Sequence, residues 1–444
     1  MNDSTNCDPP AGIPPAHERI ARAFCLGVAG VVFAALALGT MYRDFRILLT
    51  ANGSSFFYPS SIYGIAPLPA AAPSAKRATA AGVDFSQVYN SAIALRHGQS
   101  AYRSRNGDIP NPFGREPGYG YPPLTNWLYV PLSLLPYGAA LMTHAVLSVC
   151  LFLGIALHVL VKAGLVRQSA VVCLVLFGLY FLTPIGVTHL ERGQFDLFVA
   201  AAVLACISCL LLPGGHPGLA VAAGLLGAMK WTSVPFLLCF CALGVVSAER
   251  RKRRDFFLVP AVMLLATLAF GSGLKEYWPT IQKFEIGAKP FGLTLQNFMP
   301  RWAARSVLPA VTLGAAALVR IAARSPAARG RLFAAIGLPF ALALSCLSIC
   351  FGTLSYEYHA VTLLGLIPAV VVWTVREPEV SRRGKVVICG AFGAFLCVAF
   401  RAVTLYVFSP VIMTAVYGVA ALLFLGVCAG IVRTRGVSLE DDRA

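Results

Sequence analysis

Apolar runs of about twenty residues recur along nearly the whole of this 444-residue chain, and they constrain its fold more than any other feature. A helix needs about 20 apolar residues to cross the hydrocarbon core of a bilayer, and it satisfies its own backbone hydrogen bonds there. Only 12% of the residues are charged, whereas soluble globular proteins carry roughly 25%. The sequence therefore predicts an all-α, polytopic integral membrane protein with about twelve transmembrane helices.

The positions of these runs predict the order of helices and loops. Predicted transmembrane helices lie near residues 20–40, 138–161, 169–187, 195–212, 256–272, 306–322, 332–351, 359–375, 386–408 and 411–432, with two short crossings inside 218–248 that meet near Lys230. They form one transmembrane domain over 20–433, between cytoplasmic tails at 1–19 and 434–444. The first extracytoplasmic loop, 41–137, is long, and its apolar part at 123–136 is expected to lie along the membrane surface.

The formal charge of +17 comes largely from basic residues in short loops between the apolar runs. The main clusters are Arg250, Arg251, Lys252, Arg253 and Arg254, then Arg324, Arg329 and Arg331, and finally Arg382, Arg383 and Lys385. Clusters of this kind mark cytoplasmic loops, so the chain is predicted to be a multi-pass protein of the inner (plasma) membrane. Nucleic acid is not a predicted partner, because no basic groove with interleaved aromatic residues is present.

The cysteines and motifs exclude several other classes of site. Of the 13 cysteines all but Cys7 lie inside apolar runs, which argues against a disulfide framework. Cys206 and Cys209 are expected to pack as small apolar side chains. There is no His and carboxylate spacing typical of a zinc site, no phosphate-binding glycine loop and no nucleophile elbow. No cofactor is predicted, and no metal-binding residues are identified.

The predicted topology gathers polar side chains on the extracytoplasmic face. These residues are Asp84, Tyr121, Glu191, Arg192, Gln194, Lys230, Asn297, Tyr356, Glu357 and His359. Ionisable groups so close to apolar helices are costly unless they are used. The sequence therefore predicts a site at this face, whose partners are membrane lipids and molecules that reach it from the bilayer.

Several of these residues have two interpretations. Asp84 precedes a stretch with helical apolar spacing, so it could cap a helix or act as a general base for an acceptor hydroxyl. Tyr121 lies in a proline-containing turn, and its ring would also suit contact with a sugar or a lipid. Arg192 is either part of a solvated turn or a ligand for phosphate oxygens.

Lys230 and His359 also have alternatives. Lys230 stands alone in an apolar stretch, where it could snorkel to the headgroups or neutralise a leaving phosphate. His359 follows Glu357 at the outer start of a predicted helix, where it is either structural or a proton donor to a departing phosphate.

A set of short motifs occurs in a characteristic order along the chain. The set comprises Asp84-Phe85, Tyr89, Gly98, Tyr102, Tyr121-Pro122-Pro123, Pro131-Leu132, Leu135-Pro136, Gly193-Gln194, Lys230, Gln296-Asn297 and His359. In this order the motifs resemble glycosyltransferase family 87 of the C-type glycosyltransferase superfamily, which includes polyprenol-phosphate-mannose-dependent mannosyltransferases. The resemblance extends from about Asp84 to the helix after His359.

The resemblance implies roles and a reaction. Asp84 would be the catalytic base and His359 a second catalytic residue near the donor phosphate. Residues expected to bind the donor phosphate or substrate are Tyr121, Arg192, Gln194, Lys230, Asn297 and Glu357. The implied reaction is an inverting single displacement, in which a hexose, with mannose foremost, passes from a polyprenyl-phosphate-sugar donor to a lipid or glycan acceptor at the extracytoplasmic face.

Two departures from the family pattern are visible. The stretch between the first predicted helix and Asp84 is unusually long, which leaves Asp44, also followed by a phenylalanine, as a less favoured rival for the base. The family usually carries asparagine after Gly-Gln, whereas Phe195-Asp196 follow here, which weakens a role for that turn.

A transporter or flippase of a lipid-linked sugar is the alternative function. Transporters often contain internal repeats and paired broken helices near the midplane, and no convincing repeat relates the two halves of this chain. A structural membrane protein would leave the gathered polar residues unexplained. The sequence therefore favours a membrane glycosyltransferase.

Overall fold

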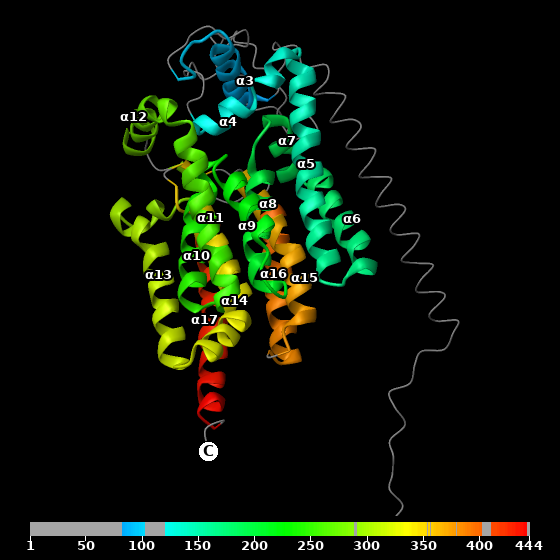
Figure 1. Ribbon diagram of the computed structural model, residues 1–444, viewed down its shortest axis with the longest axis vertical. Helices are drawn as coiled ribbons and strands as arrows, with labels where there is room; N and C mark the ends of the chain where they lie inside the picture. The colour runs from blue at the N-terminus through cyan, green and yellow to red at the C-terminus, as the bar shows by residue number, and fades with distance from the viewer. Residues whose placement is uncertain are drawn as a thin grey trace, which may run out of the picture.

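The computed structural model describes residues 82–102, 120–287, 291–352, 354–355, 357–378, 380–401 and 410–441. The predicted tails, the predicted helix at 20–40, most of the first loop with Asp44, and Tyr356 lie outside the described residues. Within them the chain forms a bundle of long helices, with the short helices that follow residue 82 gathered at one end (Figure 1).

Among the described residues, six helical segments are long and apolar enough to cross a membrane. Five are α5 (Tyr137–Lys162), α13 (Arg301–Ala322), α14 (Pro326–Ile349), α16 (Arg382–Arg401) and α17 (Pro410–Asp441), and the sixth is η4 (Glu357–Gly365) continued by α15 (Leu366–Arg376). A bent pair, α11 (Arg250–Ala269) and α12 (Gly271–Gly287), would make a seventh. The predicted all-α, polytopic membrane fold is confirmed.

Shorter apolar helices accompany the long ones. They are α6 (Val166–Leu182), α8 (Asp196–Leu211), α9 (Pro217–Gly227) and η2 with α10 (Trp231–Ser233 and Val234–Ser247). Among them α6, α9 and α10 keep some apolar side chains exposed. Every predicted span in the described residues therefore corresponds to a long helix, the bent pair or one of these shorter helices. The break between α9 and α10 falls at Lys230, as predicted, and Pro235 lies in the first turn of α10.

The predicted helix at 169–187 is divided in the structure. α6 ends at Leu182, and α7 (Pro184–Arg192) begins after Thr183, whose hydroxyl caps it by accepting from the Gly186 amide at 3.4 Å. Proline at the first helical position suits a helix start but not a helix interior. The break redirects the chain so that α7 ends beside the start of α8.

Short helices collect at the end of the bundle that carries α7. They are α3 (Val83–Arg96), α4 (Pro123–Leu128) and η1 (Pro131–Leu134). The predicted surface segment at 123–136 therefore forms two short helices, and it exposes apolar side chains such as Trp127 and Leu134. The basic start of α11 and the turn between α13 and α14 lie at the opposite end (Figure 1).

The central element of the bundle is α8. Every side chain from Asp196 to Leu210 is buried, and the helix packs against α5, α9, α15 and η4. Cys206 and Cys209 are fully buried in it as free thiols, packing as small apolar side chains as expected. Because α8 is buried along its length, its first residue, Asp196, lies in the interior at the end where the short helices gather.

A small pairing ties two late connections together. The two-residue strands β1 (Phe291–Gly292) and β2 (Leu354–Ser355) are parallel, with Phe291 opposite Leu354. The 3-10 helix η3 (Leu295–Asn297) follows β1, and the Leu295 amide donates to the Cys350 carbonyl at 2.9 Å. This pairing fixes the connection that leads into η4.

Candidate functional site

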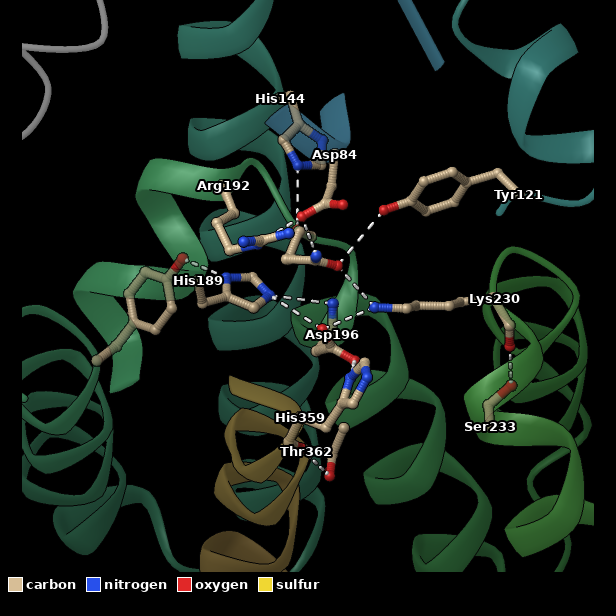
Figure 2. Close-up of polar contacts among 12 residues, drawn as sticks. Asp84, Tyr121, His144, His189, Arg192, Asp196, Lys230, Ser233, His359 and Thr362 are labelled. Carbon is tan, nitrogen blue, oxygen red and sulfur yellow. Dashed lines mark hydrogen bonds and ion pairs between the residues drawn. The ribbon is translucent and has the colours of Figure 1, made fainter. Parts of the chain in front are cut away.

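Five chain segments converge where the short helices meet the bundle. They are the start of α3, the end of α7, the start of α8, the break between α9 and α10, and the start of η4. Figure 2 shows the polar side chains that these segments bring together. Because most of these segments are far apart in the sequence, the site depends on the whole bundle.

Two glycines allow α3 to approach the end of α7. Gly82 precedes α3 with φ of 77°, and Gly193 ends α7 with φ of 63°, a left-handed conformation that favours glycine. A Cβ on Gly193 would lie 2.5 Å from the Phe85 Cβ and 2.9 Å from Leu141. The Gly82 carbonyl accepts from the Tyr137 hydroxyl at 2.9 Å, which holds the start of α3 on α5.

The first ion pair of the site joins Asp84 to Arg192. Asp84 Oδ2 accepts from Arg192 Nε at 2.6 Å and from Gln194 Nε2 at 2.5 Å. Gly82 is the N-cap residue of α3, and no side chain caps this helix. The helix-cap interpretation of Asp84 is therefore wrong, and the carboxylate is available for interactions across the site.

The second ion pair joins Lys230 to Asp196. Lys230 Nζ lies 2.8 Å from Asp196 Oδ2, and Asp196 Oδ1 lies 2.9 Å from His359 Nδ1. The Asp196 side chain is fully buried, and that of Lys230 is 8% exposed. Because the ammonium group points inward to a carboxylate, the snorkelling interpretation of Lys230 is wrong. Removal of either partner of such a pair would leave the other charge buried without compensation.

A single amide bridges the two ion pairs. Gln194 Nε2 donates to Asp84, while Gln194 Oε1 accepts from Lys230 Nζ at 2.8 Å and from the Tyr121 hydroxyl at 3.4 Å. An ammonium group can only donate, so the carbonyl end of the amide must face Lys230. Two carboxylates and two cations thus belong to one hydrogen-bonded network (Figure 2).

Two buried histidines support the backbone of this network. His189 Nε2 accepts from the Asp196 amide at 3.0 Å, so the proton lies on Nδ1 and is donated to the Tyr180 hydroxyl at 2.9 Å. Burial lowers the pKa of His189 to about 3, which keeps the ring neutral. His144 has the opposite tautomer: Nε2 donates to the Gln194 carbonyl at 3.2 Å, and Nδ1 accepts from Tyr129.

The structure brings together six of the eight side chains predicted for the site. They are Asp84, Tyr121, Arg192, Gln194, Lys230 and His359. Asn297 lies in η3, and its Nδ2 donates to Thr414 Oγ1 at 3.3 Å. Glu357 begins η4 through its backbone, and the structure does not describe the position of its side chain.

Sequence reasoning missed the residue at the centre of the network. Asp196 contacts Lys230 and His359 through its side chain and His189 through its amide. Phe195-Asp196 had counted against a role for this turn, whereas the carboxylate occupies its centre. A lone carboxylate that opens a wholly apolar run is a signal that could have found it.

The arrangement suits an anionic substrate and a proton transfer. Guanidinium and ammonium groups bind phosphate oxygens, and a carboxylate within hydrogen-bond reach of a hydroxyl can take its proton. No group of three or more His, Cys, Asp or Glu side chains suited to a metal ion is found among the residues described.

The chain is similar to known proteins in sequence and in structure. A sequence model of glycosyltransferase family 87 matches residues 119–345, slightly more than half of the chain. One similar solved structure is that of ArnT from Cupriavidus metallidurans bound to undecaprenyl phosphate, with 15% identity and a TM-score of 0.43 over 92% of this chain and 77% of that one. The apo state of the same enzyme has 16% identity and a TM-score of 0.41 over 93% and 78% of the two chains.

Among curated proteins, none matches the chain at a significant level. The segment that matches the family carries Tyr121, Arg192, Gln194, Asp196 and Lys230, and so contains most of the network. The chain belongs to glycosyltransferase family 87 and is a multi-pass membrane glycosyltransferase.

Proposed function

We propose that this enzyme transfers a hexose, with mannose as the first choice, from a polyprenyl-phosphate-linked donor to a hydroxyl of a lipid or glycan acceptor. The reaction would take place at the extracytoplasmic face of the inner membrane. One observation carries the proposal: a carboxylate suited to be a base, Asp84, and two cations suited to phosphate, Arg192 and Lys230, belong to one network bridged by Gln194.

The base would act on the acceptor. Asp84 takes the proton of the acceptor hydroxyl as its oxygen forms a bond to the anomeric carbon of the donor sugar. The bond from that carbon to the phosphate oxygen breaks, and its electron pair leaves with the polyprenyl phosphate. A single displacement of this kind inverts the anomeric configuration, so the product carries the configuration opposite to that of the donor.

The cations would act on the leaving phosphate. Arg192 and Lys230 attract the phosphate to the bridged network, and charge that develops on its oxygens is stabilised by fixed donors. His359 bonds to Asp196 through Nδ1, which directs Nε2 away from that carboxylate. His359 Nε2 would then exchange a proton with the departing phosphate.

Asp196 would be a positioning residue. Its two oxygens hold Lys230 and His359 at 2.8 and 2.9 Å, and it is too deeply buried to meet the acceptor. A third group that orients a catalytic side chain is common in enzyme sites. Loss of Asp196 should therefore affect the leaving-group side of the reaction through Lys230 and His359.

The test is sugar transfer by the purified protein in lipid nanodiscs. The protein is offered a panel of radiolabelled polyprenyl-phosphate sugars and a membrane lipid extract, beside the Asp84→Asn variant. The matched control is Glu249→Gln, which replaces an exposed carboxylate at the far end of the bundle. Transfer from one donor that is lost only in Asp84→Asn supports the proposal and identifies the sugar. Donor that crosses the bilayer unaltered would instead support a flippase.

A further inference from the structure

Two buried side-chain amides beside the network each have an oxygen that accepts no hydrogen bond from the described residues. These atoms are Gln87 Oε1 and Asn126 Oδ1. The Gln87 residue is 5% exposed and Asn126 is fully buried. Buried polar atoms are nearly always paired with protein or with another molecule, so these oxygens indicate an absent hydrogen-bond donor.

The orientation of the Asn126 amide is fixed by its neighbours. The Tyr102 hydroxyl donates to the Tyr121 carbonyl at 3.0 Å, so its proton is committed. Asn126 Nδ2 lies 3.1 Å from the same hydroxyl and must be the donor to it. The Asn126 oxygen is therefore left as an acceptor, next to the turn that carries Tyr121.

Gln87 lies close to the proposed base. It follows Asp84 by three residues in α3, so both side chains leave the same face of the helix. A Cβ placed on Gly120 would lie 3.6 Å from Gln87 Oε1, which locates this oxygen at the start of the Tyr121 turn. An acceptor that reaches Asp84 past this turn would meet the Gln87 oxygen.

Further unpaired donors lie in η2, and several aromatic rings lie in η2 and α12. The Trp231 indole N–H and the Thr232 hydroxyl are also buried without a partner among the described residues. The Trp231 ring stacks on Tyr277, with centroids 5.9 Å apart and planes at 22°. Trp278, which is 53% exposed, lies 6.5 Å from the Trp231 ring and extends this aromatic surface outward.

One hydrogen bond joins α4 to the segment just before η2. The hydroxyl of Thr125, the neighbour of Asn126 in α4, donates to the Met229 carbonyl at 2.7 Å. Met229 lies immediately before Lys230 and two residues before Trp231. Asn126 and Trp231 therefore lie on segments that are bonded directly to each other, and Trp231 is next to Lys230 of the catalytic network.

We infer that Gln87, Asn126 and Trp231 form a subsite for the sugar of the acceptor, a neutral and hydroxyl-rich ring. Sugar hydroxyls can donate to the two amide oxygens and accept from the indole N–H, and the apolar face of the ring can pack on Trp231 or Trp278. All these groups are uncharged, which favours a glycan over an anionic headgroup. The inference rests on the proposed function, because it assigns the acceptor of that reaction.

The variants that test the inference each remove few atoms. Trp231→Phe removes the indole N–H but keeps an aromatic ring, and Gln87→Met removes the oxygen acceptor at similar volume. Trp373→Phe is the matched control, because Trp373 also has a buried indole N–H that finds no partner in the described part of the chain, but it lies in α15, away from the site.

The experiment has a kinetic arm and a binding arm, both on full-length protein in nanodiscs. The probes are octyl α-mannoside, octyl β-glucoside and octyl β-galactoside, below their micelle concentrations. In the kinetic arm, loss of one neutral hydrogen bond should raise the acceptor KM about three- to tenfold in Trp231→Phe and Gln87→Met. The donor KM should change less than twofold, and Trp373→Phe should match the parent enzyme.

The binding arm measures equilibrium binding of each tritiated glycoside without donor, so it does not depend on the proposed reaction. Saturable binding that weakens in Trp231→Phe and Gln87→Met but not in Trp373→Phe supports the subsite even where no donor is consumed. Absence of glycoside binding to the parent protein, or equal binding by all variants, would overturn the inference. The unpaired atoms would then be hydrogen-bonded to ordered water instead.

Discussion

Replacement of Asp196 by asparagine tests how the buried network is held together. The substitution keeps the volume of the side chain but leaves the Lys230 ammonium, 8% exposed, without its carboxylate partner. Removal of one partner of a buried ion pair costs about 3–5 kcal/mol, because the other charge stays buried without compensation. We therefore expect Asp196→Asn to lower the free energy of unfolding by about that amount.

A double variant separates stability from activity. Lys230→Met removes the stranded charge, so Asp196→Asn with Lys230→Met should be more stable than the sum of the single effects predicts, by about 2 kcal/mol. Sugar transfer should stay low in all three variants, since each loses Lys230 or its positioning. The assay is reversible unfolding in mixed micelles, followed by intrinsic fluorescence. An unchanged stability of Asp196→Asn, or additive effects in the double variant, would refute the account of the buried pair.

Three further predictions concern the rest of the site. Arg192→Ala should raise the donor KM about tenfold or more, because a charged hydrogen bond to phosphate is lost. Replacement of Arg305, an exposed arginine of α13, by alanine should leave the donor KM unchanged. Kinetics at varied donor concentration measure both values. Gly193→Ala should lower the thermal midpoint and abolish transfer, because its Cβ would lie 2.5 Å from the Phe85 Cβ in a left-handed backbone. The pKa of His189 is lowered from 6.5 to about 3 in the folded protein. Below pH 6.5 the unfolded state therefore binds a proton that the folded state does not, and the stability decreases as the pH is lowered. Above pH 6.5 both states are neutral and this contribution is constant, and unfolding at pH 5 to 8 should show a smaller pH dependence in His189→Gln.

The helices of this protein could be predicted well because the bilayer imposes their length and composition. The apolar runs located α5 and α8 closely, and the lone Lys230 marked the break between α9 and α10. The break at Thr183 was not predicted, since the apolar run continues past it and a proline at a helix start looks the same as a proline inside a helix.

The site was predicted in part, through residue type and the expected side of the membrane. Asp84, Arg192 and Lys230 stand out because a charge in an apolar context is costly. Their pairing could not be derived, because Asp84 and Arg192 are 108 residues apart and meet only through the packing of α3 on α7. Asp196 was misjudged for the same reason: its partners come from two later segments.

The most direct test of the central claim is the single-turnover rate of sugar transfer by Asp84→Asn, with whichever donor the parent enzyme consumes. Asparagine keeps the shape of Asp84 and can still meet Arg192 and Gln194 in the folded protein, but it cannot accept a proton. The account predicts that the rate falls by about 10²- to 10⁴-fold, while donor binding and thermal stability stay close to those of the parent enzyme. Transfer at the parent rate by a folded Asp84→Asn variant would contradict it.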